Sequence, residues 1–269
     1  MFKIALNAGH GINTAGKRCL KSLDANETRE WTLNSRICNK IEEKLKAYNG
    51  YELIRLDDVT GRTDVALSTR TNKANAFNAD FYLAIHHNAG VNGKSGGGVI
   101  AITYTNVGND TKAYQEALYN AIIAKTGLRG NRAAPLQKQN LHEVRCSKMP
   151  AVLLECGFMD SSTDVPIILT DDFADKVATA CVEVLVEKGG LTKKVVEAPK
   201  PTTPTARCYA NYNGKATGIV DALKDMGIDS SFAYRSKIAK TNGIKLYTGT
   251  AKQNITMLTL LKQGKLIKP

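Results

Sequence analysis

Three of the four histidines in this 269-residue chain stand at the ends of apolar segments. His10 follows the first apolar run in the string NAGHG, and His86 and His87 end the run YLAIHHNA, whereas His142 lies in a polar stretch. In an open α/β sheet, ligands and catalytic groups collect at the ends of strands. A lone histidine there is more often structural, but two sites with the same placement favour a functional role for His10 and the His86–His87 pair.

Two acids add to this pattern. Glu30 begins an amphipathic segment at EWTLN, and Glu155 ends the apolar run PAVLLECGF. A carboxylate at the end of so apolar a strand is costly to bury unpaired, so it faces a solvent-filled opening or a cation. A Lys or Arg side chain is one such cation. Two histidines and one glutamate with an open fourth position are typical of catalytic zinc, and a second glutamate can move a proton of the water. The separations of 20 and 56 residues between His10, Glu30 and His86 match no local zinc motif.

Five short strings follow one another over about the first 190 residues, in the order NAGHG, EWTLN, RTNKAN, AIHHNA and PAVLLECGF. This order resembles that of the zinc-dependent N-acetylmuramoyl-L-alanine amidases, specifically the third class of these bacterial and phage cell-wall hydrolases. The resemblance implies one catalytic Zn²⁺ held by His10, Glu30 and His86, with Glu155 as the catalytic acid and base. It also implies a mixed, mostly parallel sheet with helices on both faces.

Two of these positions have a neighbour of the same type. Glu27 lies three residues before Glu30, but the family pattern places an asparagine four residues after the ligand, where Asn34 stands. His87 follows His86, yet the resemblance points to the first histidine, and adjacent strand residues face opposite sides of a sheet. We therefore expect Glu30 and His86 in the site.

Three further residues near these strings need an interpretation. Cys156 beside Glu155 is compatible with a cysteine hydrolase, but no cysteine here stands in a known nucleophile setting. Arg70 and Asp80 are expected to support the structure rather than to contact substrate.

The elements that would position these residues follow from hydrophobic periodicity. Segments of strand character alternate with segments of helical character, which predicts an α/β layer. The expected strands are Phe2–Asn7, Tyr51–Leu56, Phe81–His86, Val99–Tyr104 and Ala151–Glu155, and the expected helices are Glu30–Tyr48, Leu67–Phe77, Ala113–Lys125 and Asp172–Lys188.

The positive charge of the chain is concentrated at its end. Of the net charge of +12, residues 1–191 and 192–206 hold +2 each and residues 207–269 hold +8. The middle segment is rich in proline and threonine and predicts an extended linker. The last segment predicts three short helices, 218–226, 231–241 and 251–262. We therefore expect a catalytic domain at 1–191, a linker at 192–206, and a small, basic, mainly helical cell-wall-binding domain at 207–269.

Together these features predict an enzyme that hydrolyses the amide between N-acetylmuramic acid and L-alanine in peptidoglycan through a zinc-activated water. The last domain is expected to bind an anionic cell-wall polymer, since it lacks the interleaved aromatics or helix-turn-helix of a nucleic-acid binder. A catalytically inactive wall-binding protein is one alternative. Another is a zinc peptidase acting within the stem peptide, although no H-E-x-x-H string is present.

The sequence also bears on where the protein acts. With 43% hydrophobic and 23% charged residues it has the composition of a globular protein. No apolar run approaches the length of a membrane span, and the first residues do not resemble a signal peptide. We expect a phage-type endolysin or autolysin that is made in the cytoplasm and acts at the bacterial cell wall after release.

Overall fold

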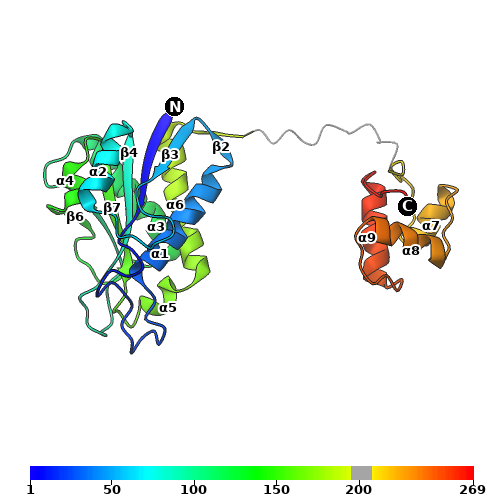
Figure 1. The fold of residues 1–269 in the computed structure, drawn as a ribbon, viewed down its shortest axis with the longest axis horizontal. Helices are drawn as coiled ribbons and strands as arrows, with labels where there is room; N and C mark the ends of the chain where they lie inside the picture. Colours follow the sequence, from blue (N-terminus) through cyan, green and yellow to red (C-terminus); the bar gives the residue numbers. More distant parts are fainter. Residues whose placement is uncertain (195–207) are drawn as a thin grey trace. The chain divides into compact units, whose positions relative to one another are not determined.

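The computed structural model describes residues 1–194 and 208–269, which belong to two compact units, Met1–Lys194 and Val195–Pro269 (Figure 1). From residue 195 on, the predicted linker at 192–206 lies outside the described residues. Its first residues do not belong to a linker, because β8 (Thr192–Lys193) pairs antiparallel with β2 (Tyr48–Asn49). The predicted boundary after residue 191 is therefore too early.

The first unit is built around a six-stranded sheet with the order β3-β1-β4-β7-β5-β6. All neighbouring strands run parallel except β5 and β7, which are antiparallel. The mixed, mostly parallel sheet that the sequence predicted is confirmed. The strands are β1 (Phe2–Ala8), β3 (Tyr51–Arg55), β4 (Phe81–Asn88), β5 (Val99–Thr103), β6 (Leu136–Lys138) and β7 (Ala151–Phe158).

Helices cover both faces of this sheet. One face packs against α1 (Glu30–Leu45), α3 (Asn109–Thr126) and α6 (Asp171–Gly189), while α2 (Leu67–Ala76) and α4 (His142–Cys146) lie on the other, and the short α5 (Val165–Ile168) precedes α6. Central strands are therefore apolar on both sides. In β4, Phe81, Leu83 and Ile85 enter the core shared with α1 and α6, and Tyr82 and Ala84 enter the opposite core.

The helices follow from their apolar periodicity and from capping residues at their ends. In α1 the residues Leu33, Ile37, Ile41 and Leu45 recur every four positions, and all are buried against the sheet. The Thr170 side chain accepts a hydrogen bond from the first turn of α6, and α3 ends at a left-handed glycine.

The strand order brings distant parts of the sequence to one edge. β1, β4 and β7 are adjacent and parallel, so their carboxyl ends lie side by side. His10 follows β1, while His86 of β4 and Glu155 of β7 are direct neighbours across the two strands. Because α1 begins at Glu30 beside this edge, the sheet itself assembles the residues that the sequence singled out.

The described part of the second unit, residues 208–269, contains three helices, α7 (Ile219–Asp225), α8 (Phe232–Thr241) and α9 (Ala251–Lys262), as predicted. They bury a small apolar core of their own, which includes Ile219, Leu223, Ile238, Met257 and Leu261. Thr250 and Gln253 form a capping box at the start of α9. Among the described residues of both units, none of the helices has the length and hydropathy needed to cross a membrane.

The centre of the sheet should be sensitive to lost volume. Leu83 is fully buried between Leu6 of β1 and Val152 of β7, so Leu83→Ala leaves a cavity and should lower the free energy of unfolding by about 2–5 kcal/mol. Leu67→Ala is the matched control, because Leu67 is 48% exposed. Denaturant unfolding measures both variants, and equal effects would contradict this account of the core.

Candidate active site

His10, Glu30 and His86 meet at the carboxyl edge of the sheet. Oε1 of Glu30 lies 3.4 Å from Nε2 of His10 and 3.2 Å from Nδ1 of His86. One potential ligand atom from each side chain lies within 4.8 Å of the other two. The two imidazoles meet edge to face, with 5.0 Å between ring centroids. The structure thus brings together the three side chains that were predicted as metal ligands.

The loop after β1 has a conformation that explains the string NAGHG. His10 adopts a left-handed backbone, with φ of 65°. A Cβ on Gly9 would overlap the His86 ring, so only glycine permits this approach. The buried guanidinium of Arg70 donates hydrogen bonds to the carbonyls of Ala8 and His10, at 2.7 and 3.1 Å. Arg70 therefore holds the loop, in the supporting role expected for it.

The charges of the cluster suit a divalent cation. Burial would raise the pKa of Glu30, but its hydrogen bond with His86 lowers the pKa to about 2, so the carboxylate is ionised. Burial lowers the pKa of His10 to about 4, which keeps that imidazole neutral at neutral pH. Oε2 of Glu30 is buried without a hydrogen-bond partner, 3.7 Å from Nζ of Lys17. The neutral imidazole of His10 and the ionised carboxylate of Glu30, with its free oxygen, are in the protonation states that zinc requires of its ligands.

The residues next to the predicted ligands lie elsewhere. His87 points away from His86, and its Nδ1 lies 2.7 Å from Oδ1 of Asn34 on α1. Glu27 forms an ion pair with Arg18. The choices of His86 over His87 and of Glu30 over Glu27 therefore agree with the residues that converge.

Glu155 lies beside this cluster on β7, as the neighbour of His86 across the strands. Its Oε2 is buried and has no hydrogen-bond partner. Burial raises the pKa of the Glu155 carboxyl to about 7. The adjacent Cys156 faces the opposite core, where burial raises the pKa of its thiol well above the ordinary value. A thiolate is thus disfavoured at Cys156, which argues against a cysteine hydrolase.

Glu143 is a member of the site that the sequence analysis missed. Its Oε2 lies 3.1 Å from Nε2 of His86, and its Oε1 accepts hydrogen bonds from Asn7 and Tyr82 at 2.6 and 2.7 Å. Although burial opposes ionisation, the hydrogen bond with His86 lowers the pKa of Glu143 to about 2. With carboxylates at both ring nitrogens, the pKa of His86 rises to about 10 in spite of its burial.

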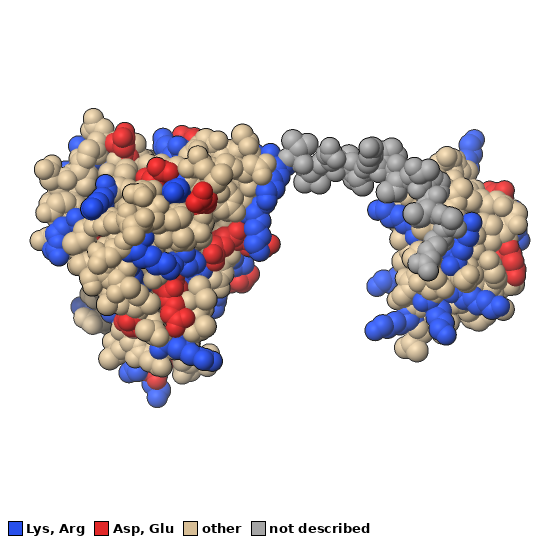
Figure 2. All heavy atoms as spheres, turned by 45° about the horizontal axis from the view of Figure 1, so that its top comes forward, with Lys and Arg blue, Asp and Glu red and all other residues tan. Residues whose placement is uncertain are grey.

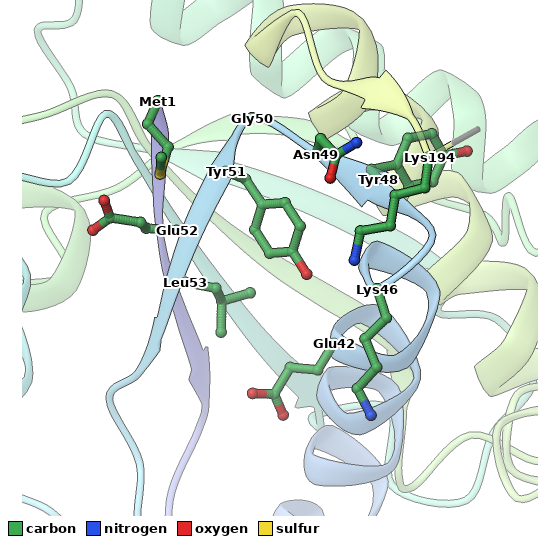
Figure 3. A pocket seen from close by; sticks show the side chains of 10 residues that line it. All are labelled: Met1, Glu42, Lys46, Tyr48, Asn49, Gly50, Tyr51, Glu52, Leu53 and Lys194. Atoms are coloured by element: carbon green, nitrogen blue, oxygen red, sulfur yellow. The ribbon is translucent and has the colours of Figure 1, made fainter. Parts of the chain in front are cut away.

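A hollow of about 340 Å³ opens beside His10, His86 and Glu143 and extends along residues 64–67. A larger hollow, of about 530 Å³, lies at the amino ends of β1 and β3 (Figure 3). Aromatic and apolar residues line it together with four charged ones, and its lining contains no histidine or cysteine. The charged residues are Glu42, Lys46, Glu52 and Lys194. Its lining offers no constellation for hydrolysis, so the smaller hollow is the candidate substrate site.

The comparison with known proteins identifies the family. Residues 4–187 match the family model described as N-acetylmuramoyl-L-alanine amidase. The chain belongs to the N-acetylmuramoyl-L-alanine amidase family. As a member it is a hydrolase of the peptidoglycan amidase type, as the five strings had predicted.

Curated relatives agree with this family assignment, and a solved structure has the same fold. The chain is 33% identical over 238 residues to a sporulation-specific N-acetylmuramoyl-L-alanine amidase of Bacillus subtilis, covering 84% of this chain and 86% of the relative. It is 32% identical over 197 residues to an endolysin of Bacillus phage SPP1, covering 70% and 66%. The catalytic domain of CwlV, an N-acetylmuramoyl-L-alanine amidase from Paenibacillus polymyxa, has the same fold, with a TM-score of 0.63, 23% identity, and coverage of 71% of this chain and all of that domain.

The raised pKa of Glu155 makes a prediction for the stability of this amidase without metal. The ordinary pKa of a glutamate is 4.5, and that of Glu155 in the folded protein is about 7. Between these two pH values Glu155 is ionised in the unfolded chain but still protonated in the folded protein, so the free energy of unfolding falls as the pH rises. Glu155→Gln removes this pH dependence. Its free energy of unfolding relative to that of wild type should therefore rise by on the order of 2–3 kcal/mol between pH 5 and pH 8. Urea unfolding in the presence of a chelator measures the difference.

The control for this measurement is Glu116→Gln, because Glu116 is exposed on α3. Its free energy of unfolding should differ little from that of wild type at either pH. A Glu155→Gln difference that is the same at pH 5 and pH 8 would contradict the buried, partnerless carboxyl.

Proposed function

We propose that this chain hydrolyses the amide between N-acetylmuramic acid and L-alanine in peptidoglycan, with His10, Glu30 and His86 holding one Zn²⁺. The convergence of these three side chains beside Glu155 is the observation that carries the proposal. The donor set of two imidazoles and one carboxylate is that of catalytic rather than structural zinc sites, which are usually closed by four protein ligands. Zinc in such a site supplies a Lewis acid that polarises a carbonyl and acidifies water.

Glu155 is the group that moves protons in this proposal. A carboxyl with a pKa near 7 is present in both protonation states at neutral pH, which suits a residue that must first accept and then donate a proton. Its carboxylate takes a proton from the attacking water as the oxygen bonds to the lactyl carbonyl carbon. It then gives that proton to the nitrogen of L-alanine as the C–N bond breaks, leaving a carboxylate on the sugar and a free amine on the peptide.

One rival function is weakened by these side chains, and the other is distinguished by its products. An inactive wall-binding protein has no use for a partnerless buried carboxyl beside an ion-binding cluster, since such a group destabilises the fold. A peptidase acting within the stem peptide would break a different amide, and the two activities differ in the new termini that they release.

We further propose that the second unit anchors the enzyme to an anionic polymer of the cell wall. Residues 207–269 hold 11 Lys and Arg against 3 Asp. Within the described residues 208–269 no Lys or Arg forms an ion pair, and two of the three Asp side chains accept other hydrogen bonds, Asp225 from Tyr212 and Asp229 from the backbone of Ser231. Figure 2 shows these cations spread over the visible face of the unit. Anchoring raises the effective concentration of the catalytic unit at its substrate.

Digestion of purified peptidoglycan tests the catalytic proposal. Wild type should release new N-terminal L-alanine without new reducing sugar, and a chelator should abolish the release. Glu155→Gln should lower the rate by about 10²–10⁴-fold, the usual share of general acid–base catalysis. Glu116→Gln serves as the control and should keep full activity. Chelator-resistant cleavage, new termini inside the stem peptide, or full activity of Glu155→Gln would overturn the proposal.

A further inference from the structure

A hollow of about 480 Å³ lies on the second unit, between α8 and the loop that follows it. Ser236 and Lys240 of α8 form one side, and Lys245, Leu246 and Tyr247 of the loop form the other. No acidic residue lines this hollow. It is the candidate ligand site of the second unit.

The loop presents an apolar tip in a strained conformation. Leu246 is 92% exposed and has a φ of 50°, a left-handed conformation that is unfavourable for a branched side chain. Gln253 of the α9 capping box holds it there, donating to the carbonyl of Leu246 at 3.0 Å and accepting from the amide of Thr248 at 3.0 Å. The hydrogen bonds of Gln253 thus hold Leu246 in a strained backbone conformation while its side chain stays exposed. Backbone strain of this kind is typical of residues that contact a ligand.

The aromatic wall of the hollow is equally fixed. The Tyr247 hydroxyl accepts from Arg235 at 2.5 Å and donates to Asn254 at 2.6 Å. Its ring stacks on Phe232, with 5.6 Å between centroids. The hollow is therefore a preformed surface with a rigid ring, an apolar tip and two lysines.

We propose that this hollow binds a phosphodiester-linked polymer of the cell wall, with Lys240 and Lys245 contacting successive phosphates and Leu246 and Tyr247 contacting the intervening polyol or sugar. The lysines point to phosphate, because an ammonium binds phosphate as a compact charge, whereas paired carboxylate recognition favours arginine. The alternation of charge and apolar surface matches a polymer whose anionic groups are separated by uncharged units. This inference rests on the proposed wall-anchoring function of the second unit.

The test uses the full chain carrying Glu155→Gln, so that walls are not digested, and measures co-sedimentation with purified Gram-positive walls. One portion of the walls keeps its phosphodiester-linked polymers, and the other is stripped of them with hydrofluoric acid. Lys240→Gln with Lys245→Gln should weaken binding about tenfold, corresponding to about 1.4 kcal/mol. Lys215→Gln with Lys262→Gln removes the same charge outside the hollow and should weaken binding less than threefold.

The outcomes separate this site from the anchoring function. If the Glu155→Gln parent, with no change in the second unit, does not sediment with untreated walls, both the anchoring function and the proposed site are wrong. If the parent sediments but both double variants bind equally more weakly, the proposed site is wrong and binding rests on diffuse charge. The same conclusion follows if stripped walls bind the chain as well as untreated walls do and soluble DNA competes as well as the polymer. Leu246→Ser should weaken binding without changing the melting temperature, and unchanged binding would contradict the role of the apolar tip.

The geometry also assigns a positioning role in the active site to Glu143, on independent observations. His86 faces Glu30 with Nδ1, so its Nε2 is the nitrogen left for Glu143, at 3.1 Å. A carboxylate at the second ring nitrogen fixes the tautomer and orientation of a metal-binding histidine. Glu143 is 4% exposed and is itself held by Tyr82 and Asn7, so this orientation is set before any ion binds.

Zinc affinity, measured by competition with a chromophoric chelator, tests this role without reference to activity. Glu143→Gln and Glu143→Leu should each lower the affinity about 10–100-fold. Tyr82→Phe removes one hydrogen bond of Glu143 but leaves its contact with His86, so it should change the affinity less than threefold. Absence of zinc binding by wild type would overturn the zinc site and this role together. Wild-type affinity in both Glu143 variants would overturn the role alone.

Discussion

The buried carboxylate of Glu30 is the interaction on which the active site depends. It is 1% exposed, and its charge is balanced by the imidazole of His86 and the ammonium of Lys17, while the neutral imidazole of His10 lies 3.4 Å away. A carboxylate at this depth without such partners would be strongly destabilising. The loop after β1, the start of α1 and the end of β4 therefore meet at this carboxylate, and the sheet order is what makes that meeting possible.

Three glutamates surround the same imidazole, and their environments give them different properties. Glu30 and Glu143 share hydrogen bonds with His86 that lower the pKa of each to about 2, whereas Glu155 has a buried oxygen without a partner and a pKa of about 7. Environments that separate the pKa values of like groups also separate their roles. At neutral pH two of these acids are therefore ionised, whereas Glu155 is present in both protonation states.

The sequence was informative wherever one short segment carried the signal. Apolar runs ending in His10, His86 and Glu155 predicted both the strands and the side chains that meet at their ends, because a parallel sheet collects those ends at one edge. Glu143 was missed because α4 has only five residues within a polar stretch, and its contact with His86 joins positions 57 residues apart. Likewise, periodicity extended α1 to Tyr48, whereas pairing of β2 with β8 ends that helix at Leu45 and moves the domain boundary.

The close approach of Gly9 to the His86 ring constrains how this site can evolve. A methyl group at position 9 would occupy the space of the ring itself, so the ring would have to move or be replaced by a smaller side chain. Either change would displace or remove one of the three converging side chains. A substitution of the glycine therefore alters the site at position 86 in the same step.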